Sequence, residues 1–283
     1  MATSEQAQRL NQRINSAAST RGEASSRLRH RLAFQRILAR LSTVPGWVLT
    51  GGFSLEARLG LDARATKDLD LRRRQANNSS WSDMQEALED VLDQDIGDGF
   101  TFQVGRPRRL GLADTEQATW RVQVRVAYYG SPFADVQVDI AETAAPDSGD
   151  TTTLEIEPAL IGNPFTIATI DLNRHAAEKF HACLRIYAHD RPSSRVKDLV
   201  DLVLLIEGDW LKADLLRAAL TRVFAERNGS EPPPEMPSQP PADWAVTYPA
   251  LATEVSIAND TLEQGWALAS AYYQNAIRPQ EHK

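Results

Sequence analysis

Two stretches in the middle of the chain alternate strictly between apolar and polar residues. In residues 120–128, WRVQVRVAY, a tryptophan, three valines and a tyrosine fall on one face, and residues 135–140, DVQVDI, repeat the alternation. Successive side chains of a strand point to opposite sides, so each stretch predicts a strand with one apolar and one polar face. Such strands are typical of a mixed or antiparallel sheet that is covered on one side.

Helical and strand patterns alternate through the first third of the chain. Residues 3–42 predict two helices with a break near residues 19–22. A short apolar strand, WVLT at residues 47–50, then leads into two glycines and an apolar, helix-like stretch. Residues 67–72, KDLDLR, alternate again, and residues 81–92 have helical spacing.

The last part of the chain is helical and is interrupted by prolines. Apolar spacing predicts helices over about residues 173–189, 194–207 and 210–227. Residues 228–241, NGSEPPPEMPSQPP, contain too many prolines for a helix or a central strand and predict a linker or an extended surface segment. The helical piece that follows is rich in Trp and Tyr, so we expect it to dock on the body of the protein.

These patterns predict three parts: N-terminal helices in residues 1–45, a domain of strands and helices in residues 46–170, and a helical domain in residues 171–283. The expected fold class is α/β (more strictly α+β). A small mixed β-sheet flanked by helices precedes a C-terminal helical lobe.

Composition excludes several classes of protein. The 283 residues are 42% hydrophobic and 24% charged, as in ordinary globular domains. No apolar run reaches the ~20 residues of a membrane span, and the N-terminus lacks the apolar core of a signal peptide, so we expect a cytoplasmic protein without a membrane partner. Cys183 is the single cysteine, which excludes an intramolecular disulfide and a cysteine-based zinc site.

Charge is distributed unevenly along the chain. The net charge of −7 argues against a protein that coats nucleic acid without specificity. The segment from Arg9 to Arg40, however, contains eight arginines and one acid, Glu23, and carries +7 against −14 for the remainder. Two interpretations stay open: a basic arm that contacts phosphates, or a solvated helix face that uses Arg as a good helix former.

The strongest chemical signal is a glycine pair followed by an acidic pair. Gly51 and Gly52 stand between a strand and a helix, where backbone N–H groups can approach an anion, and Ser54 adds a hydroxyl donor. Asp68 and Asp70 lie two apart on a strand, so both carboxylates share one face and repel each other unless a cation lies between them. Oxygen ligands on a rigid strand favour Mg²⁺. A phosphate cradle with paired carboxylates suits metal-assisted transfer from a nucleoside triphosphate.

Asp139 is the best candidate for a third carboxylate. It lies on the polar face of an alternating strand, between Val138 and Ile140, and Asp135 on the same face is the alternative. The competing interpretation of either residue is an exposed acid of a strand.

Two later helices hold further candidates. Lys179 lies at the border of an apolar stripe, where a lysine extends to water or reaches a triphosphate oxygen. Asp198 and Asp201 lie opposite the main stripe of the next helix, on a side that becomes apolar one turn later, so we expect them at the rim of a buried region. Lys197 is adjacent in sequence and would balance these acids.

The motifs resemble those of a known family. WVLTGGFSLEARLG followed by RATKDLDL resembles the first motif of the AbiEii/AbiGii-type nucleotidyltransferase toxins, which include the MenT toxins of mycobacteria. The wider group is the DNA polymerase β-like nucleotidyltransferase superfamily, whose Gly-Gly or Gly-Ser turn and Asp-x-Asp are matched here. VQVDI resembles the strand of the third carboxylate, HAAEKFHA a Glu-Lys motif at Glu178 and Lys179, and RVKDLVDL a Lys-Asp motif at Lys197 and Asp198. The 15 residues between Gly52 and Asp68 exceed the usual gap, and Ser54 must take any hydroxyl role.

The resemblance implies a nucleotidyltransferase lobe in residues 46–170 and a helical lobe that completes the site. It also implies Mg²⁺, a nucleoside triphosphate (NTP) substrate and an acceptor at the 3′ end of tRNA, whose modification blocks translation. A toxin of this type IV-like toxin–antitoxin group usually has a cognate antitoxin. The site residues that it implies are Gly51, Gly52, Ser54 and Lys179 at the nucleotide, Asp68, Asp70 and Asp139 at the metal, and Lys179 and Asp198 as further catalytic residues.

Two other functions remain open at this stage. The first keeps the chemistry and changes the acceptor to a protein hydroxyl or a small molecule such as an aminoglycoside. The second is a nucleotide-binding regulatory module without turnover, which the intact pair of carboxylates disfavours because a binder gains nothing from their repulsion.

Overall fold

The computed structural model describes residues 2–74, 80–110, 119–143, 149–185 and 195–278. The chain divides into two compact units, one made of residues 1–60 and 65–170 and the other of residues 61–64 and 171–283. In the described ranges, no helix is long and apolar enough to cross a bilayer.

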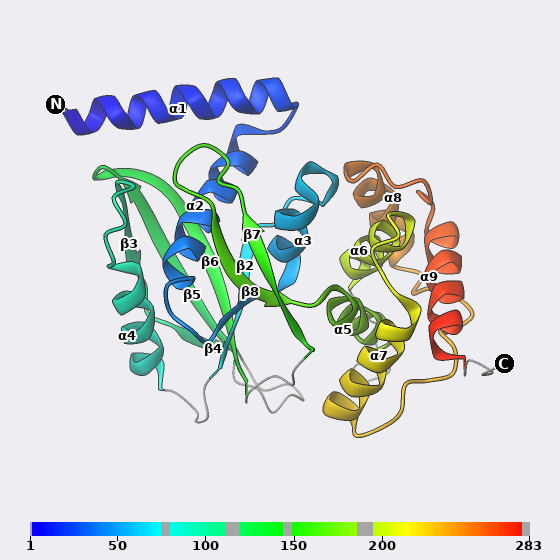
Figure 1. The fold of residues 1–283 in the computed structure, drawn as a ribbon. Coiled ribbons are helices and arrows are strands. Elements are labelled where there is room, and N and C mark those ends of the chain that lie inside the picture. Colours follow the sequence, from blue (N-terminus) through cyan, green and yellow to red (C-terminus); the bar gives the residue numbers. More distant parts are fainter. Residues whose placement is uncertain (1, 75–79, 111–118, 144–148, 186–194, 279–283) are drawn as a thin grey trace. The chain divides into compact units, whose positions relative to one another are not determined.

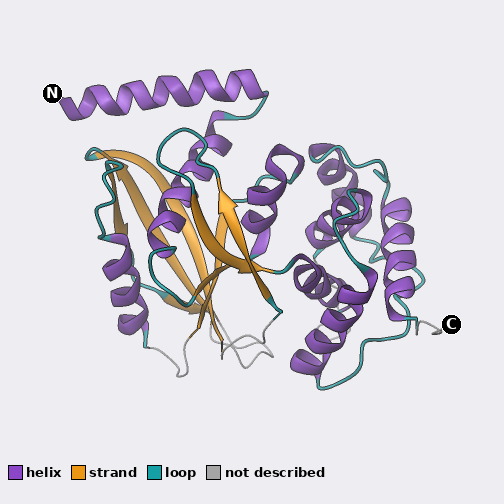
Figure 2. Ribbon diagram, viewed as in Figure 1, coloured by secondary structure: helices purple, strands orange, loops and turns teal. Residues whose placement is uncertain are grey.

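The first unit is built on one mixed sheet (Figure 2). The strands of its described part follow the order β3-β5-β6-β2-β1-β8-β7, and β4 pairs with β5 beside β3. The pairs β2·β6 and β1·β8 are parallel, whereas the other pairs are antiparallel. The strands are β1 Trp47–Leu49, β2 Asp68–Arg74, β3 Phe100–Val104, β4 Arg108–Leu110, β5 Thr119–Tyr128, β6 Ser131–Thr143, β7 Thr151–Ile156 and β8 Phe165–Ile170. The strands expected from the two central alternating stretches are thus confirmed as β5 and β6.

Helices cover one face of this sheet. Helix α2 packs on β6 and β8, α1 on α2 and β6, and α4 on β3 and α2 (Figure 1). The apolar side chains of β2, β5 and β6 point toward these helices and are buried with them in one core. The polar side chains of the same strands therefore lie on the opposite face. The helices of this unit are α1 Ala2–Arg21, α2 Ser25–Leu41, α3 Gly51–Leu59 and α4 Trp81–Leu92, and the short 3₁₀ helix η1 Gly60–Asp62 follows α3 and continues into residues 61–64 of the second unit.

The arginines of α2 form ion pairs inside this unit. Arg27 binds Glu56 at 2.9 Å and Arg31 binds Glu23 at 2.8 Å. Arg40 makes two hydrogen bonds to Asp98, of 2.8 and 3.0 Å, and Arg36 is only 1% exposed. Both interpretations of the basic arm are wrong for these four residues, because their side chains neutralise acids of the same unit and are not presented to solvent or to an RNA.

We expect Asp98→Asn to lower the free energy of unfolding by about 3–5 kcal/mol, because the change removes the acid that faces two buried guanidinium groups. Urea unfolding followed by circular dichroism measures this loss. The matched control is Asp95→Asn, an exposed neighbour that accepts a hydrogen bond from the Gly97 amide, as asparagine also does. Equal unfolding midpoints for the two variants would contradict the assignment.

The described residues of the second unit form helices and loops and no β-strand. The proline-rich segment runs along α9 without helix or strand, with hydrogen bonds from Trp266 Nε1 to the Pro237 carbonyl and from the Tyr273 hydroxyl to the Pro233 carbonyl. The predicted extended segment is confirmed from residue 229 onward, and the aromatic-rich piece packs within this unit as two helices, α8 and α9, in place of one. The ends of the helices predicted over 173–189 and 194–207 lie partly outside the described residues. The helices are α5 Leu172–Leu184, α6 Val196–Glu207, α7 Ala213–Asn228, α8 Trp244–Glu254 and α9 Leu262–Ile277.

Candidate active site

The glycine pair forms the junction between β1 and α3. Gly51 has a φ of +62°, a left-handed conformation that favours glycine. A Cβ atom at Gly51 would overlap the carboxylate of Asp70, so the Asp70 side chain lies directly against the start of α3. The amide of Thr50 also donates to the Asp70 carbonyl at 3.0 Å, which fixes the two segments together. The turn at Gly51 and Gly52 therefore lies in contact with strand β2 at Asp70, as the order of the motifs predicts.

Ser54 lies further along α3 and is fully buried. The structure does not present its hydroxyl at the surface where Gly51 meets Asp70. Its role at the triphosphate stays a prediction.

The three predicted acids lie on adjacent strands. In the parallel pair of β2 and β6, Asp70 is opposite Asp139 and Asp68 is opposite Gln137. Gln137 donates from Nε2 to Asp68 at 2.8 Å. Because strand side chains alternate, Asp68, Asp70 and Asp139 share the polar face of the sheet.

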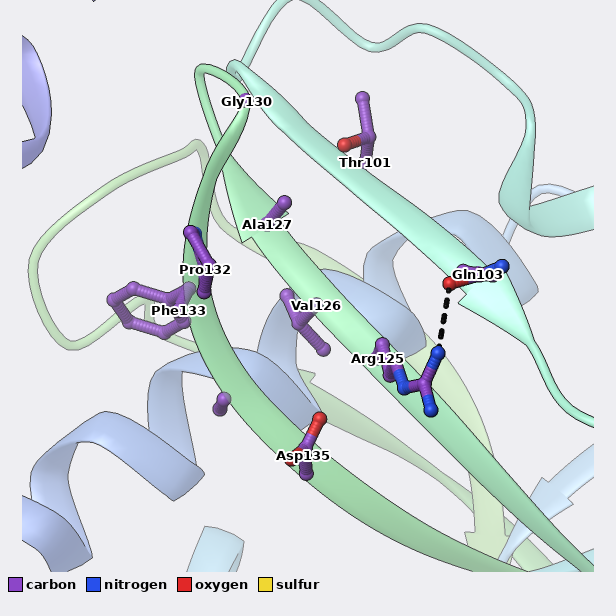
Figure 3. Close-up of a pocket in the computed structure, with 10 residues that line it drawn as sticks. Thr101, Gln103, Arg125, Val126, Ala127, Gly130, Pro132, Phe133 and Asp135 are labelled. Atoms are coloured by element: carbon purple, nitrogen blue, oxygen red, sulfur yellow. Dashed lines mark hydrogen bonds between the residues drawn. The ribbon is translucent and has the colours of Figure 1, made fainter. Parts of the chain in front are cut away.

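Asp135, the alternative third acid, lies elsewhere on the same face. The pairing of β6 with β2 begins at Gln137, so Asp135 has no partner on β2 and lies opposite Arg125 of β5. Together with Thr101, Gln103 and Arg125 it lines a shallow pocket of about 390 Å³, where Arg125 donates to Gln103 (Figure 3). The register therefore favours Asp139 over Asp135.

Arg121 also lies on this face and is not part of any predicted motif. It lies on β5 opposite Asp139 and binds both oxygens of that carboxylate, with Nε to Oδ1 at 2.9 Å and Nη2 to Oδ2 at 2.7 Å. The hydrogen bonds to Asp139, together with the charges of Asp139, Asp68 and Asp70, raise the pKa of Arg121. The alternation of β5 in the sequence places Arg121 on the polar face. The sequence does not show which strand pairs with β5, so it does not show that Asp139 is the partner of Arg121.

The chemistry of these donors fits a divalent cation. Carboxylate oxygens are the ligands that Mg²⁺ prefers. Asp68 and Asp70 are both partly accessible, and the strand that carries them lies beside the glycine turn. Within the described residues, no three side chains of His, Cys, Asp or Glu already converge on one point as a metal site. In this structure the Asp139 carboxylate is engaged with Arg121.

Replacing Gly51 with alanine should lower the rate of the nucleotidyl transfer that the motifs imply by about 10²-fold or more. The new Cβ forces the Asp70 carboxylate out of place, and misplaced catalytic groups cost rates of this size. Gly22→Ala is the control, because Gly22 also has a positive φ, of +68°, but its Cβ would meet nothing within 4 Å. Transfer assays and melting temperatures of both variants separate the effect on Asp70 from backbone strain. Equal activities would show that the contact with Asp70 is irrelevant.

A second cluster of predicted residues lies within the helical unit. The Lys179 ammonium on α5 binds Asp198 at 3.0 Å and Asp201 at 2.7 Å, both on α6. Arg64 makes two hydrogen bonds to Asp201, and Arg195 donates to Asp198 at 2.6 Å. Lys179, Asp198 and Asp201 are each at most 5% exposed.

This geometry corrects two expectations. Lys179 does not extend from the border of its helix to water, because the two acids hold its ammonium in the interior. Lys197 does not balance these acids, since it is exposed and the cations beside them are Lys179, Arg64 and Arg195. Glu178 of the same motif binds Arg174 and Arg227. Tyr187, at the end of the apolar stripe that Lys179 borders, lies outside the described residues.

Comparison with known proteins agrees with the motifs. No curated protein matches the chain significantly. A sequence model described as "Nucleotidyl transferase AbiEii toxin, Type IV TA system" matches residues 33–273, a range that covers most of both units and contains each predicted site residue. The chain belongs to this AbiEii family of nucleotidyltransferase toxins of toxin–antitoxin systems.

Proposed function

We propose that this protein transfers a nucleoside monophosphate from an NTP to the 3′-terminal hydroxyl of tRNA, with Mg²⁺ and with release of pyrophosphate, and thereby blocks translation until its antitoxin neutralises it. The observation that carries the chemistry is the register that sets Asp70 beside Asp139, with Asp70 against the glycine turn. An anionic triphosphate at the start of α3 and a cation at the neighbouring acids would then lie next to each other.

In this proposal the glycine turn, the acidic pair of β2 and Asp139 have different roles. The backbone amides at Gly51 and Gly52, at the N-terminus of α3, bind the triphosphate. Asp68 and Asp70 would hold the metal ion, which supplies charge neutralisation of the phosphates when bound. Asp139 completes the ligand set or accepts the proton of the attacking acceptor hydroxyl.

The residues of the helical unit are proposed to act on the nucleotide. Lys179 is the family's nucleotide-facing lysine in this proposal, and Asp198 positions it through their 3.0 Å ion pair. To contact a triphosphate oxygen, the Lys179 ammonium has to exchange one of its two carboxylate partners for that oxygen. A point charge that can rotate among partners suits this exchange better than a guanidinium.

The test is incubation of the purified protein with each of the four labelled NTPs, Mg²⁺ and total RNA, followed by separation of RNA, protein and small molecules. Label in the tRNA fraction that is lost after removal of the 3′-terminal nucleotides supports the proposal. Label in protein or in a small molecule would show that the acceptor is that molecule and not tRNA. Absence of any label with every NTP would favour a binding module instead. Asp70→Asn is the negative control in each reaction.

A further inference from the structure

The polar face of the sheet carries a row of three charged residues. Arg121 on β5 lies opposite Asp139 on β6, which lies opposite Asp70 on β2. Neighbouring strands are about 4.8 Å apart, so this row brings one arginine and two acids together across three strands. Arg121 is thus a cation that lies directly beside one of the acids proposed to hold the metal.

The contact between Arg121 and Asp139 is of the strong, two-point kind. Nε and Nη2 of Arg121 bind different oxygens of Asp139 at 2.9 and 2.7 Å, which fixes the plane of the carboxylate. The pair is partly buried: the Asp139 side chain is 15% exposed and that of Arg121 is 39% exposed. In this arrangement the guanidinium offsets the mutual repulsion of Asp68, Asp70 and Asp139.

A divalent cation that uses Asp139 has to compete with this guanidinium. The cation and Arg121 attract the same carboxylate, and they repel each other at the few ångströms that separate neighbouring strands. The contact with Arg121 also favours the fold, because in the absence of a metal the guanidinium offsets part of the mutual repulsion of the three acids.

We propose that Arg121 is a positioning residue that holds Asp139 in the metal-free protein and lowers its affinity for divalent cations. The inference rests on the metal part of the proposed function. Asp139 then becomes a metal ligand only when the cation displaces Arg121, so Arg121 sets the metal concentration at which the site is completed.

Arg125 provides a matched comparison. It lies four residues along β5 on the same polar face, opposite Asp135, and donates to Gln103 at 3.4 Å (Figure 3). Both arginines carry one charge on the same strand, but Arg125 is not in the row of Asp70 and Asp139. A difference between variants of the two residues therefore reports the contact with Asp139 and not a general change in charge.

The test is a titration of the full-length protein with Mn²⁺ in the absence of nucleotide. Binding is measured by calorimetry or by the electron paramagnetic resonance signal of unbound Mn²⁺. We expect Arg121→Gln to bind Mn²⁺ about tenfold more tightly than the wild type, and Arg125→Gln to stay within twofold. Arg121→Lys, which keeps a charge but loses the two-point contact, should lie between them. The melting temperature of Arg121→Gln should fall without metal and rise more steeply than that of the wild type as Mn²⁺ is added.

The outcomes separate the inference from the proposed function. Unchanged or weaker Mn²⁺ binding by Arg121→Gln, with clear binding by the wild type, overturns the inference and leaves the metal site standing. An equal gain in Arg125→Gln also overturns it, because the effect would then be long-range charge alone. Absence of Mn²⁺ binding in every variant overturns the inference together with the metal part of the proposed function.

Discussion

Asp70→Asn should abolish nucleotidyl transfer, with a loss of about 10³-fold or more, while the protein stays folded. Asparagine keeps the size of the side chain that lies against Gly51 but removes the negative charge proposed to hold the metal. Loss of such a ligand removes several kcal/mol of transition-state stabilisation, and each 1.4 kcal/mol is about tenfold in rate. Transfer of labelled nucleotide at saturating Mg²⁺ measures the effect. Asp68→Asn should behave in the same way.

The control for these variants is Asp135→Asn. Asp135 is an exposed acid of the same polar face, but the pairing of β6 with β2 begins two residues later. We expect its variant to keep activity within about threefold and all three variants to melt close to the wild type. Near-normal turnover of Asp70→Asn would show that the metal assignment is wrong. An equal loss of activity in Asp135→Asn would show that the loss comes from the lower charge of this face and not from a missing metal ligand.

Much of the sheet could be predicted because its strands have one apolar and one polar side. From Trp120 to Val126 of β5 and from Val136 to Ile140 of β6 every second residue enters the core, so the sequence alternates over these residues. Strand β8 lacks this signal. Its buried face carries Ile167 and Thr169, whereas Thr166 and Ala168 are exposed, so a threonine enters the core and an alanine faces outward. The buried Thr169 hydroxyl donates to the Leu49 carbonyl, a partner far away in the sequence, and no local pattern of apolar and polar residues identifies this strand.

The candidate site could be predicted as far as its residues act within one motif. Gly51, Gly52 and the two acids of β2 are close in sequence, so their common location follows from the turn and the alternation. The pairing of Arg121 with Asp139 depends on which strands are neighbours and in which register. The same holds for the arginines of α2, because Arg40 finds its acid at Asp98, far along the chain. Composition gives the charge of a segment but not the partner of each charge.

Removal of Lys179 should lower the free energy of unfolding by about as much as the loss of the Asp98 charge. Lys179→Met keeps the length of the side chain but leaves Asp198 and Asp201 buried without their shared cation. Breaking a buried ion pair from one side costs about 3–5 kcal/mol, because the remaining charge is left uncompensated. Arg64 and Arg195 stay beside the acids, which keeps the loss within this range. Lys197→Met, at an exposed position of α6, should change the free energy of unfolding by about 0.5 kcal/mol or less.

The loss in Lys179→Met should depend on pH in a defined direction. Burial by itself raises the pKa of Asp198, but the charges of Lys179 and Arg195 and their hydrogen bonds outweigh it and lower this pKa to about 2. An aspartate in the unfolded chain titrates near 3.9. The ion pair therefore adds stability above about pH 4 and loses it as the pH falls toward about 2. Without Lys179 the pKa of Asp198 is higher, so the difference between variant and wild type is largest at neutral pH and narrows on acidification.

Urea unfolding of the wild type, Lys179→Met and Lys197→Met at pH 7 and near pH 3 measures both parts of this prediction. Equal midpoints of the two variants at pH 7 would show that the buried pair contributes no net stability. A gap that stays constant or widens toward pH 3 would contradict the role of the Asp198 charge. Transfer is then assayed at a temperature where Lys179→Met is still folded, next to Lys179→Arg, which keeps a cation between the acids. If Lys179 also contacts the triphosphate, Lys179→Arg recovers most of the stability but less of the activity, because a planar guanidinium fixed by two carboxylates exchanges partners less readily than an ammonium. Full recovery of both would assign Lys179 to the interior of the helical unit alone, and the nucleotide would then be held by the glycine turn and the acids of the sheet.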